Sequence, residues 1–241
     1  MNDAQAQADF ALSMGDTTLI LGHRLSEWTG HAPVLEEELA TANVALDLTG
    51  QAQLWLTLAG VLDGSGRDAD QLAYFRDGPD YRNALLVEQP NGDFAHTLVR
   101  QFFFDAWHHL LIEGLVLHPQ AGIAEIAGKA IKEIRYHLER SSEWVVRLGD
   151  GTPESNARMS AAVARLWPYA GELLEISALA SLALDANWRA RVEQVLQAAT
   201  LSMPNDAWAH SGGLHGRHSE HLGKLLAEMQ VLQRSYPGAQ W

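Results

Sequence analysis

The stretch that decides the topology is DGSGRDADQLAYFRDGPDYRNALLVEQPNGD, residues 63–93, because it separates two pairs of long helical segments. It is rich in glycine, proline and aspartate, which favour turns, so we expect at most one short helical piece within it. Before it, apolar periodicity predicts a helix over about 15–29 and a second helix over about 33–62. After it, the same periodicity predicts helices over about 93–118 and about 122–148.

The lengths of the connections predict how these four helices are arranged. About three residues join the first pair and about three join the second pair, so each pair is expected to form an antiparallel hairpin. About thirty residues join one hairpin to the other. A short, long, short order of connections is typical of the ferritin-like four-helix bundle with one crossover. We therefore predict an all-α, ferritin-like bundle over about 15–149.

Additional helices are expected after the bundle. One begins at about Pro153, and Pro168 is expected to bend or split it, because proline breaks the hydrogen bonds of a helix interior. Further helices extend over about 153–236, and the whole 241-residue chain is interpreted as a single ferritin-like domain. At the start of the bundle, Asp16 or Thr17 is expected to cap the first helix.

Composition limits the class of protein. Hydrophobic residues make up 47% of the chain and charged residues 20%, as in ordinary globular proteins, and the absence of cysteine excludes disulfides and thiolate chemistry. A net charge of −13 without a basic cluster argues against a nucleic-acid partner. The N-terminus lacks a secretory signal, and Asn43, Asp47 and Gln51 argue against a membrane-spanning second helix. We therefore expect a cytoplasmic protein that does not contact a membrane.

A ferritin-like bundle fixes where the ligands of a di-iron centre would lie. The first and third helices each supply an acid, and the second and fourth each supply an acid-x-x-His pair. The candidate acids, one on each helix in turn, are Glu27, Asp47, Asp105 and Glu133. The two histidine positions hold Gly50 and Tyr136 instead. We expect the four carboxylates to face one another across the interior without a di-iron centre.

The stretch AIKEIRYH, residues 130–137, places its histidine one residue too late for an acid-x-x-His pair. His137 falls within the apolar stripe of its helix, Glu133 at the border and Tyr136 outside, so His137 is expected to be buried. Asp105 and His108 do keep the i, i+3 spacing of a half-site. Two interpretations stay open: a structural protein, or an independent ferritin-like metalloprotein with a degenerate or mononuclear site formed by Asp105, His108, Glu133 and His137.

Several strings in a fixed order resemble a known family. They are RLSEWTGHAP (24–33), ANVALDLTGQAQ (42–53), LLVEQPNGDFAHT (85–97), FDAWH (104–108), KAIKEIRYHLERS (129–141) and HSEHLGKLLAEMQVLQRSYPGAQW (218–241). Together they are similar to the C-subunit family of bacterial 1,2-phenylacetyl-CoA epoxidases, the ring-epoxidising monooxygenases of aerobic phenylacetate breakdown. The resemblance runs from about residue 10 to the C-terminus.

The resemblance implies a non-catalytic structural subunit of a multicomponent di-iron monooxygenase. It implies that the chain pairs with the catalytic A subunit and supports it, and that the chain carries no cofactor of its own. The di-iron centre is then expected in the A subunit. NADPH, flavin and iron–sulfur groups are expected in a separate reductase subunit, which is a further partner.

The crossover is also a candidate for contact with substrate. In FRDGPDYRNA, residues 75–84, the guanidinium groups of Arg76 and Arg82 are candidates to meet the phosphates of coenzyme A from across an interface. The residues assigned to this edge contact with phenylacetyl-CoA are Arg76, Asp80, Tyr81, Arg82 and Asn83. A solvated loop is the alternative interpretation of the same stretch.

Overall fold

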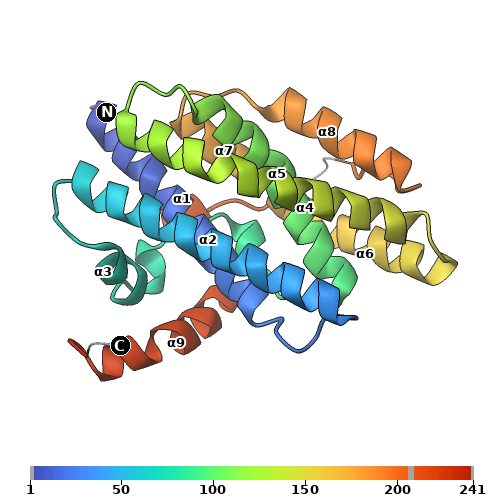
Figure 1. The fold of residues 1–241 in the computed structure, drawn as a ribbon, viewed down its shortest axis with the longest axis horizontal. Helices are drawn as coiled ribbons and strands as arrows, with labels where there is room; N and C mark the ends of the chain where they lie inside the picture. Colours follow the sequence, from blue (N-terminus) through green and yellow to red (C-terminus); the bar gives the residue numbers. More distant parts are fainter. Residues whose placement is uncertain (1–2, 206–208, 240–241) are drawn as a thin grey trace. The chain divides into compact units, whose positions relative to one another are not determined.

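The computed structural model describes residues 3–205 and 209–239, and within them the chain is helical with no strand (Figure 1). Two helical hairpins are joined by a long connection, so the predicted all-α, ferritin-like class is confirmed. The chain divides into two compact units, which we describe separately. Unit 1 comprises residues 1–90 and 212–241, and unit 2 comprises residues 91–211. The assignment of the whole chain to one domain stays a prediction.

The first hairpin, in unit 1, consists of α1 (Asp3–Ser26) and α2 (Leu35–Leu62), which pack side by side (Figure 1). Helix α1 begins well before the predicted start because its first turns bury apolar side chains, including Phe10, whose ring meets that of Trp55 edge-on at 5.7 Å. Asp16 is therefore in the middle of α1 and is fully buried. Its expected role as a helix cap was wrong.

The crossover is an ordered part of unit 1. It contains α3 (Ala69–Tyr74) and two short 3-10 turns, Gly78–Asp80 and Leu85–Glu88. The C-terminal helix α9 (Glu220–Ser235) packs against it, and the Gln230 amide donates hydrogen bonds to the carbonyl oxygens of Ala73 and Arg76. These contacts satisfy carbonyl groups at the end of α3 and just after it, and so help the crossover to keep one conformation without a long helix of its own.

The second hairpin, in unit 2, consists of α4 (Phe94–Leu115) and α5 (Ala121–Gly149), close to their predicted bounds. The Asp93 side chain caps α4 by accepting a hydrogen bond from the backbone N–H of His96 at 3.0 Å. The remaining helices of the unit are α6 (Pro153–Ala170), α7 (Glu172–Leu179) and α8 (Asp185–Ala198). Pro168 lies inside α6, and the helix ends soon after it, at Ala170.

Tryptophan side chains build the core of unit 2. The rings of Trp167 and Trp188 stack at 5.4 Å, and the indole N–H of Trp188 donates to the carbonyl oxygen of Phe103. The indole N–H of Trp107 donates to the Ser177 hydroxyl at 2.8 Å. Trp107 and Trp188 are each buried with their polar atom hydrogen-bonded, so these residues fix how α4, α7 and α8 pack within the unit.

None of the helices in the described part of the chain is both long enough and apolar enough to cross a lipid bilayer.

Two glycines of α2 provide a matched test of how closely the residues after α2 pack against that helix. A Cβ atom at Gly60 would lie 1.9 Å from the carbonyl oxygen of Arg67, whereas a Cβ at Gly50 would meet nothing within 4 Å. We expect Gly60→Ala to lower the free energy of unfolding by about 1–3 kcal/mol, because backbone must move. Gly50→Ala should raise it by about 0.5–1 kcal/mol, because glycine is the poorer helix former. Denaturant unfolding measures both, and equal effects would contradict the close approach of Arg67 to α2.

Candidate functional site

Helices α4 and α5 bring together the buried polar residues of unit 2. Asp105 and His108 lie one turn apart on α4, and both are fully buried. His137 of α5 is also buried, as its place in the apolar stripe predicts, and it lies close enough to influence the charge on Asp105. The carboxylate of Asp105 accepts a hydrogen bond from the Gln101 amide at 2.7 Å.

Burial controls the protonation of this cluster. It raises the pKa of Asp105 to about 6, although His137, Ser141, Gln101 and Arg140 oppose the rise by favouring the carboxylate. Burial, together with smaller effects of His137 and His109, lowers the pKa of His108 to about 3. The cluster therefore contains a carboxyl group that titrates near neutral pH and an imidazole that stays uncharged.

His108 sits between aromatic rings. Its ring lies 4.7 Å from that of Phe104 and stacks on that of Trp107 at 5.8 Å. Neither ring nitrogen of His108 has a hydrogen-bond partner among the described residues. A neutral imidazole in an apolar pocket is consistent with this environment, since an imidazolium would lose its hydration without compensation.

The other expected ligand positions lie elsewhere. Glu133 and Tyr136 are on the exposed side of α5, where Tyr136 is 53% exposed. In unit 1, Glu27 follows the end of α1 and pairs at 2.7 Å with the buried Arg24, its own side chain remaining 32% exposed. Gly50 is exposed. The expectation that four carboxylates face a common interior is therefore wrong for Glu27 and Glu133. Asp47 is half-buried, and only Asp105 among the four is fully buried.

These positions do not fit a di-iron centre. Such a centre needs carboxylates and imidazoles that converge on the same two ions. Here two of the four acids point to solvent, and the i+3 positions of α2 and α5 carry glycine and an exposed tyrosine. Within residues 3–205 and 209–239, no three Asp, Glu or His side chains gather closely enough to hold a metal ion. Substituting histidine for Gly50 and Tyr136 would place both imidazoles at the surface.

Sequence reasoning missed a second buried cluster, which lies in unit 1. The guanidinium of Arg76, in the crossover, pairs with both carboxylate oxygens of Asp16 in α1, and one N–H···O distance is 3.0 Å. The backbone N–H of Arg82 donates to the same carboxylate at 2.8 Å. The Arg76 guanidinium also lies over the ring of Tyr81 at 4.4 Å. The sequence does contain a sign of this cluster. Asp16 lies among apolar residues of α1, and a buried carboxylate needs a positively charged or hydrogen-bonding partner.

This pairing bears on the predicted contact with coenzyme A. Arg76, Tyr81 and Asn83 are buried, so their side chains are not presented to solvent. The half-buried Arg82 donates to the carbonyl oxygens of Pro79 and Tyr81, and the neighbouring Asp80 is exposed and acidic. The structure therefore does not support Arg76 as a ligand for phosphate, and it gives these residues a role in holding the crossover.

Glu88 ties the end of the crossover to α9. Its buried carboxylate accepts hydrogen bonds from the backbone N–H of Ser219 at 3.0 Å and from the Ser219 hydroxyl at 2.8 Å. It also faces the Nδ1 atom of His218 at 2.9 Å. From α1, Arg24 donates to the Glu88 carbonyl oxygen at 2.8 Å. We call Glu88, His218 and Ser219 the α9 clamp.

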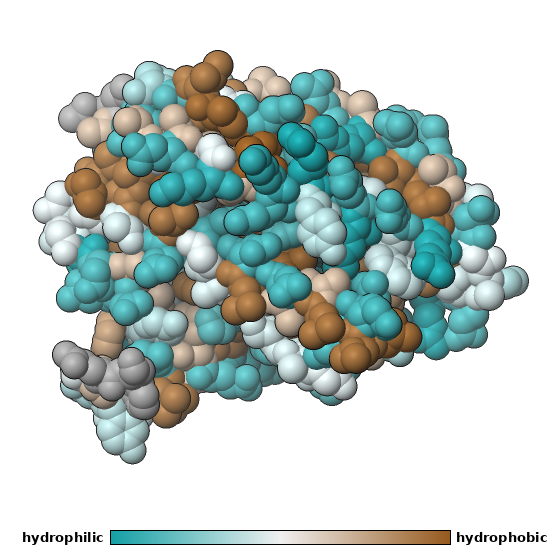
Figure 2. All heavy atoms as spheres, in the orientation of Figure 1, coloured by the Kyte–Doolittle hydropathy of each residue, from teal (hydrophilic) through white to brown (hydrophobic). Residues whose placement is uncertain are grey.

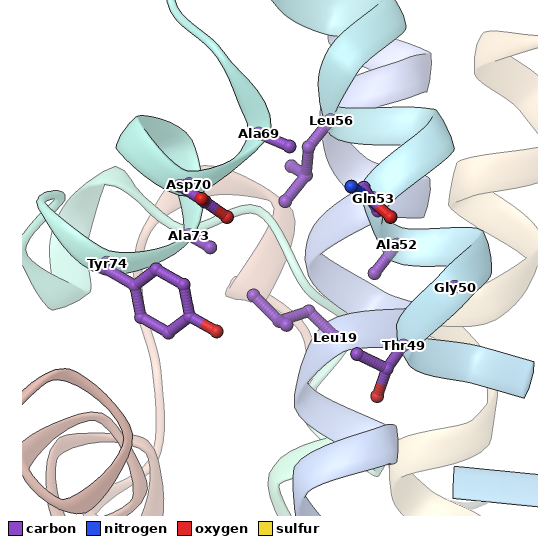
Figure 3. Close-up of a pocket in the computed structure, with 10 residues that line it drawn as sticks. All are labelled: Leu19, Thr49, Gly50, Ala52, Gln53, Leu56, Ala69, Asp70, Ala73 and Tyr74. Atoms are coloured by element: carbon purple, nitrogen blue, oxygen red, sulfur yellow. The ribbon is translucent and has the colours of Figure 1, made fainter. Parts of the chain in front are cut away.

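A cavity of about 260 Å³ opens between α1, α2 and α3 of unit 1 (Figure 3). Leu19, Leu56 and Ala73 supply apolar surface, whereas Gln53, Asp70 and Tyr74 place polar atoms around it. Ligand pockets for small molecules usually measure about 300–1,000 Å³. This cavity is smaller, but it exceeds the ~150 Å³ that suffices to hold a benzene molecule.

Two comparisons with known proteins agree on the family of this chain. A family model described as phenylacetic acid catabolic protein matches residues 1–241. The C subunit of the 1,2-phenylacetyl-CoA epoxidase of Escherichia coli (strain K12) is 46% identical over 243 residues, which cover 96% of this chain and 98% of that protein.

Replacing Asp105 by asparagine tests the buried carboxyl group. Because its folded pKa of about 6 lies above the ordinary 3.8, the stability that its proton contributes is fully present below pH 4 and is lost as the pH rises through 6. Asp105→Asn removes the charge and keeps an oxygen that accepts from Gln101. At pH 7 we expect the variant to be more stable by up to roughly 3 kcal/mol, at about 1.4 kcal/mol for each pH unit of the rise.

Unfolding of both proteins between pH 4 and pH 8 measures this difference, which should vanish at pH 4. A variant that is less stable than the parent at pH 7 would mean that His137 and Arg140 outweigh the cost of burial.

The α9 clamp predicts how the C-terminal helix responds to Glu88→Gln. The variant keeps the shape of the side chain but loses the charge that accepts from Ser219 and faces His218. We expect the free energy of unfolding to fall by about 1–3 kcal/mol, because buried donors lose their partner. Trypsin should then cleave faster after the exposed Arg217. Glu228→Gln on the exposed side of α9 is the control, and equal cleavage of the two variants would show that the clamp does not hold α9.

Proposed function

Because the chain belongs to the family of phenylacetic acid catabolic proteins, we propose that it is a non-catalytic structural subunit of a multicomponent di-iron monooxygenase. That enzyme epoxidises the aromatic ring of phenylacetyl-CoA in aerobic phenylacetate catabolism. A role in phenylacetate catabolism follows from the family and from the named relative. The structural role and the identity of the partner are our proposal.

The surface position of Glu133 and Tyr136 is the observation that carries the structural role. On a helix that supplied an acid and a histidine to a metal, both side chains would point into the interior. In α5 they point outward, and the buried positions beside them hold Ile134 and His137. The buried side of α5 therefore carries packing residues where a metal-binding helix would carry ligands. This supports a subunit that contributes its fold to the complex and no metal site.

We assign the chemistry to other subunits. The di-iron centre belongs to the catalytic A subunit, which pairs with this chain and is supported by it. Electrons come from NADPH through a reductase subunit that carries flavin and iron–sulfur groups. The complex works in the cytoplasm, where these reductants are available.

An independent metalloprotein is the alternative, with Asp105, His108, Glu133 and His137 as its ligands. The structure brings Asp105 near His137 but leaves Glu133 exposed, so this set is incomplete. The neutral His108 is enclosed by Phe104 and Trp107, which limits its access to a hydrated ion.

Reconstitution of the epoxidase separates the two functions. The chain is co-expressed with the catalytic A subunit and the other epoxidase subunits, and iron content and phenylacetyl-CoA turnover are measured. We expect stoichiometric iron in the A subunit alone. Asp105→Asn in this chain should leave turnover within a few-fold of the parent, because loss of a catalytic acid or base typically costs ~10²–10⁴-fold.

Omission of the chain should abolish stable turnover. The proposal is overturned if the purified chain alone binds stoichiometric iron, or if Asp105→Asn abolishes turnover in a complex that still assembles with the parent's stoichiometry.

A further inference from the structure

One face of α2 is exposed along its full length and is predominantly uncharged. Six residues on this face, five of them apolar and one a glycine, are spaced four or seven positions apart in the sequence. This spacing places residues on one side of a helix. They are Leu35, Leu39, Leu46, Gly50, Leu54 and Val61. Leu35, Leu46 and Val61 are each about 70% exposed, at 69%, 69% and 70%. Figure 2 shows hydrophobic side chains along the course that α2 takes in Figure 1. We call these six residues the α2 stripe.

The charges on α2 are unusual for a helix in contact with water. From Leu39 to Leu62 the only charged residue is Asp47, and α2 has no lysine or arginine anywhere. A solvated helix face normally carries charged side chains, and a helix that lies on a lipid surface normally carries basic ones. The α2 stripe fits neither environment. Its composition is that of a surface covered by protein.

Gly50 lies at the centre of the α2 stripe, and no close contact with residues 3–205 or 209–239 accounts for it. A Cβ atom at Gly15, Gly22 or Gly60 of the same hairpin would come within 3.0 Å of a neighbouring group, so close packing explains those glycines. A Cβ at Gly50 would meet nothing within 4 Å. Open space alone does not distinguish Gly50, because Gly128 of α5 has it too, among the exposed Lys129 and Lys132. Gly50 differs in lying within an uncharged, apolar stripe, where a partner backbone could approach α2 without meeting a side chain.

The cavity of about 260 Å³ adjoins the same place. Gly50 and Gln53 line it from α2, and Asp70 and Tyr74 line it from α3 (Figure 3). The α2 stripe is about 39 Å long at 1.5 Å for each residue, and one helix is about 10 Å wide. Such a strip offers roughly 400 Å², about half of one side of a standard interface. A stable contact would therefore extend from the stripe over the cavity and onto α3.

We propose that the α2 stripe and this cavity are the surface on which the catalytic A subunit docks. An apolar helix of that subunit crosses α2 at Gly50 and inserts one large apolar side chain into the cavity. A basic residue of the same helix faces the acidic first turn of α2, where Glu36 is exposed. The inference rests on the proposed function, because it takes the pairing with the A subunit as given and assigns the contact surface.

Charge favours an unlike partner over a second copy of this chain. If two α2 helices paired in parallel, the acidic first turns, with Glu36, Glu37 and Glu38, would face each other. If they paired antiparallel, that turn would face the end of α2 in the other copy, where Asp63 is already paired with Arg67 at 3.0 Å and no basic residue of α2 is present to pair with it. Each copy also carries a net charge of −13. Like charges that face each other disfavour an interface, so a helix with a basic end fits better.

The test uses substitutions that alter the stripe without harming the fold. Gly50→Leu fills open space and replaces a poor helix former, so the chain alone should melt no lower than the parent. Leu46→Glu places a charge on the stripe. We expect each variant to weaken binding of the co-expressed A subunit by about tenfold or more, because each disturbs the centre of the interface.

Two variants outside the stripe serve as controls. Gly128→Leu makes the same change at a glycine of α5 that also has nothing within 4 Å of a Cβ, and Leu232→Glu charges a 52% exposed leucine of α9. Both should bind the A subunit as the parent does. Affinity is measured by titration of the purified chains, with melting curves for each chain alone.

The outcomes distinguish the two proposals. If the parent chain does not bind the A subunit, the proposed function fails. If the parent binds and Gly50→Leu and Leu46→Glu bind equally well, the pairing stands and the α2 surface is wrong. Equal weakening by the controls, or a homodimer of the parent that Leu46→Glu dissociates, would also overturn the surface.

Discussion

The buried ion pair between Asp16 and Arg76 fixes the path of the crossover in unit 1. Asp16 lies in the middle of α1, where a carboxylate without a partner would cost several kcal/mol, and breaking such a pair typically costs about 3–5 kcal/mol. Its partners come from the crossover: the Arg76 guanidinium and the Arg82 backbone N–H. A connection that contains only one short helix is thereby held in a defined conformation against α1.

Glu88 repeats the same arrangement at the other end of the crossover. Its carboxylate binds the start of α9 through Ser219 and faces His218, and Arg24 of α1 binds its carbonyl oxygen. Buried charges in unit 1 thus join segments that lie far apart in the sequence. Since these polar groups hold the fold together, they are not presented to a substrate, which supports the structural role that we propose.

In unit 2 the expected ligand residues Asp105 and His108 are both buried. Asp105 is hydrogen-bonded to Gln101, and His108 is enclosed by aromatic rings. Burial raises the pKa of Asp105 to about 6 and lowers the pKa of His108 to about 3. In unit 1, by contrast, α2 turns an uncharged face outward with Gly50 at its centre. The recognition surface that we propose is thus an exposed helix, whereas the buried polar groups of each unit lie in its interior.

The sequence by itself determined the helices, the short, long, short order of connections and the burial of His137, because periodicity and turn residues are local properties of the chain. It also placed Gly50 and Tyr136 at the i+3 positions where an acid-x-x-His pair would carry histidine. Only the tertiary structure decided that Glu27 and Glu133 face solvent and that Asp16 and Glu88 are buried. A carboxylate is stable in the interior only with a partner, and the partners Arg76 and His218 lie 60 and 130 residues away. Sequence spacing carries no information about such contacts.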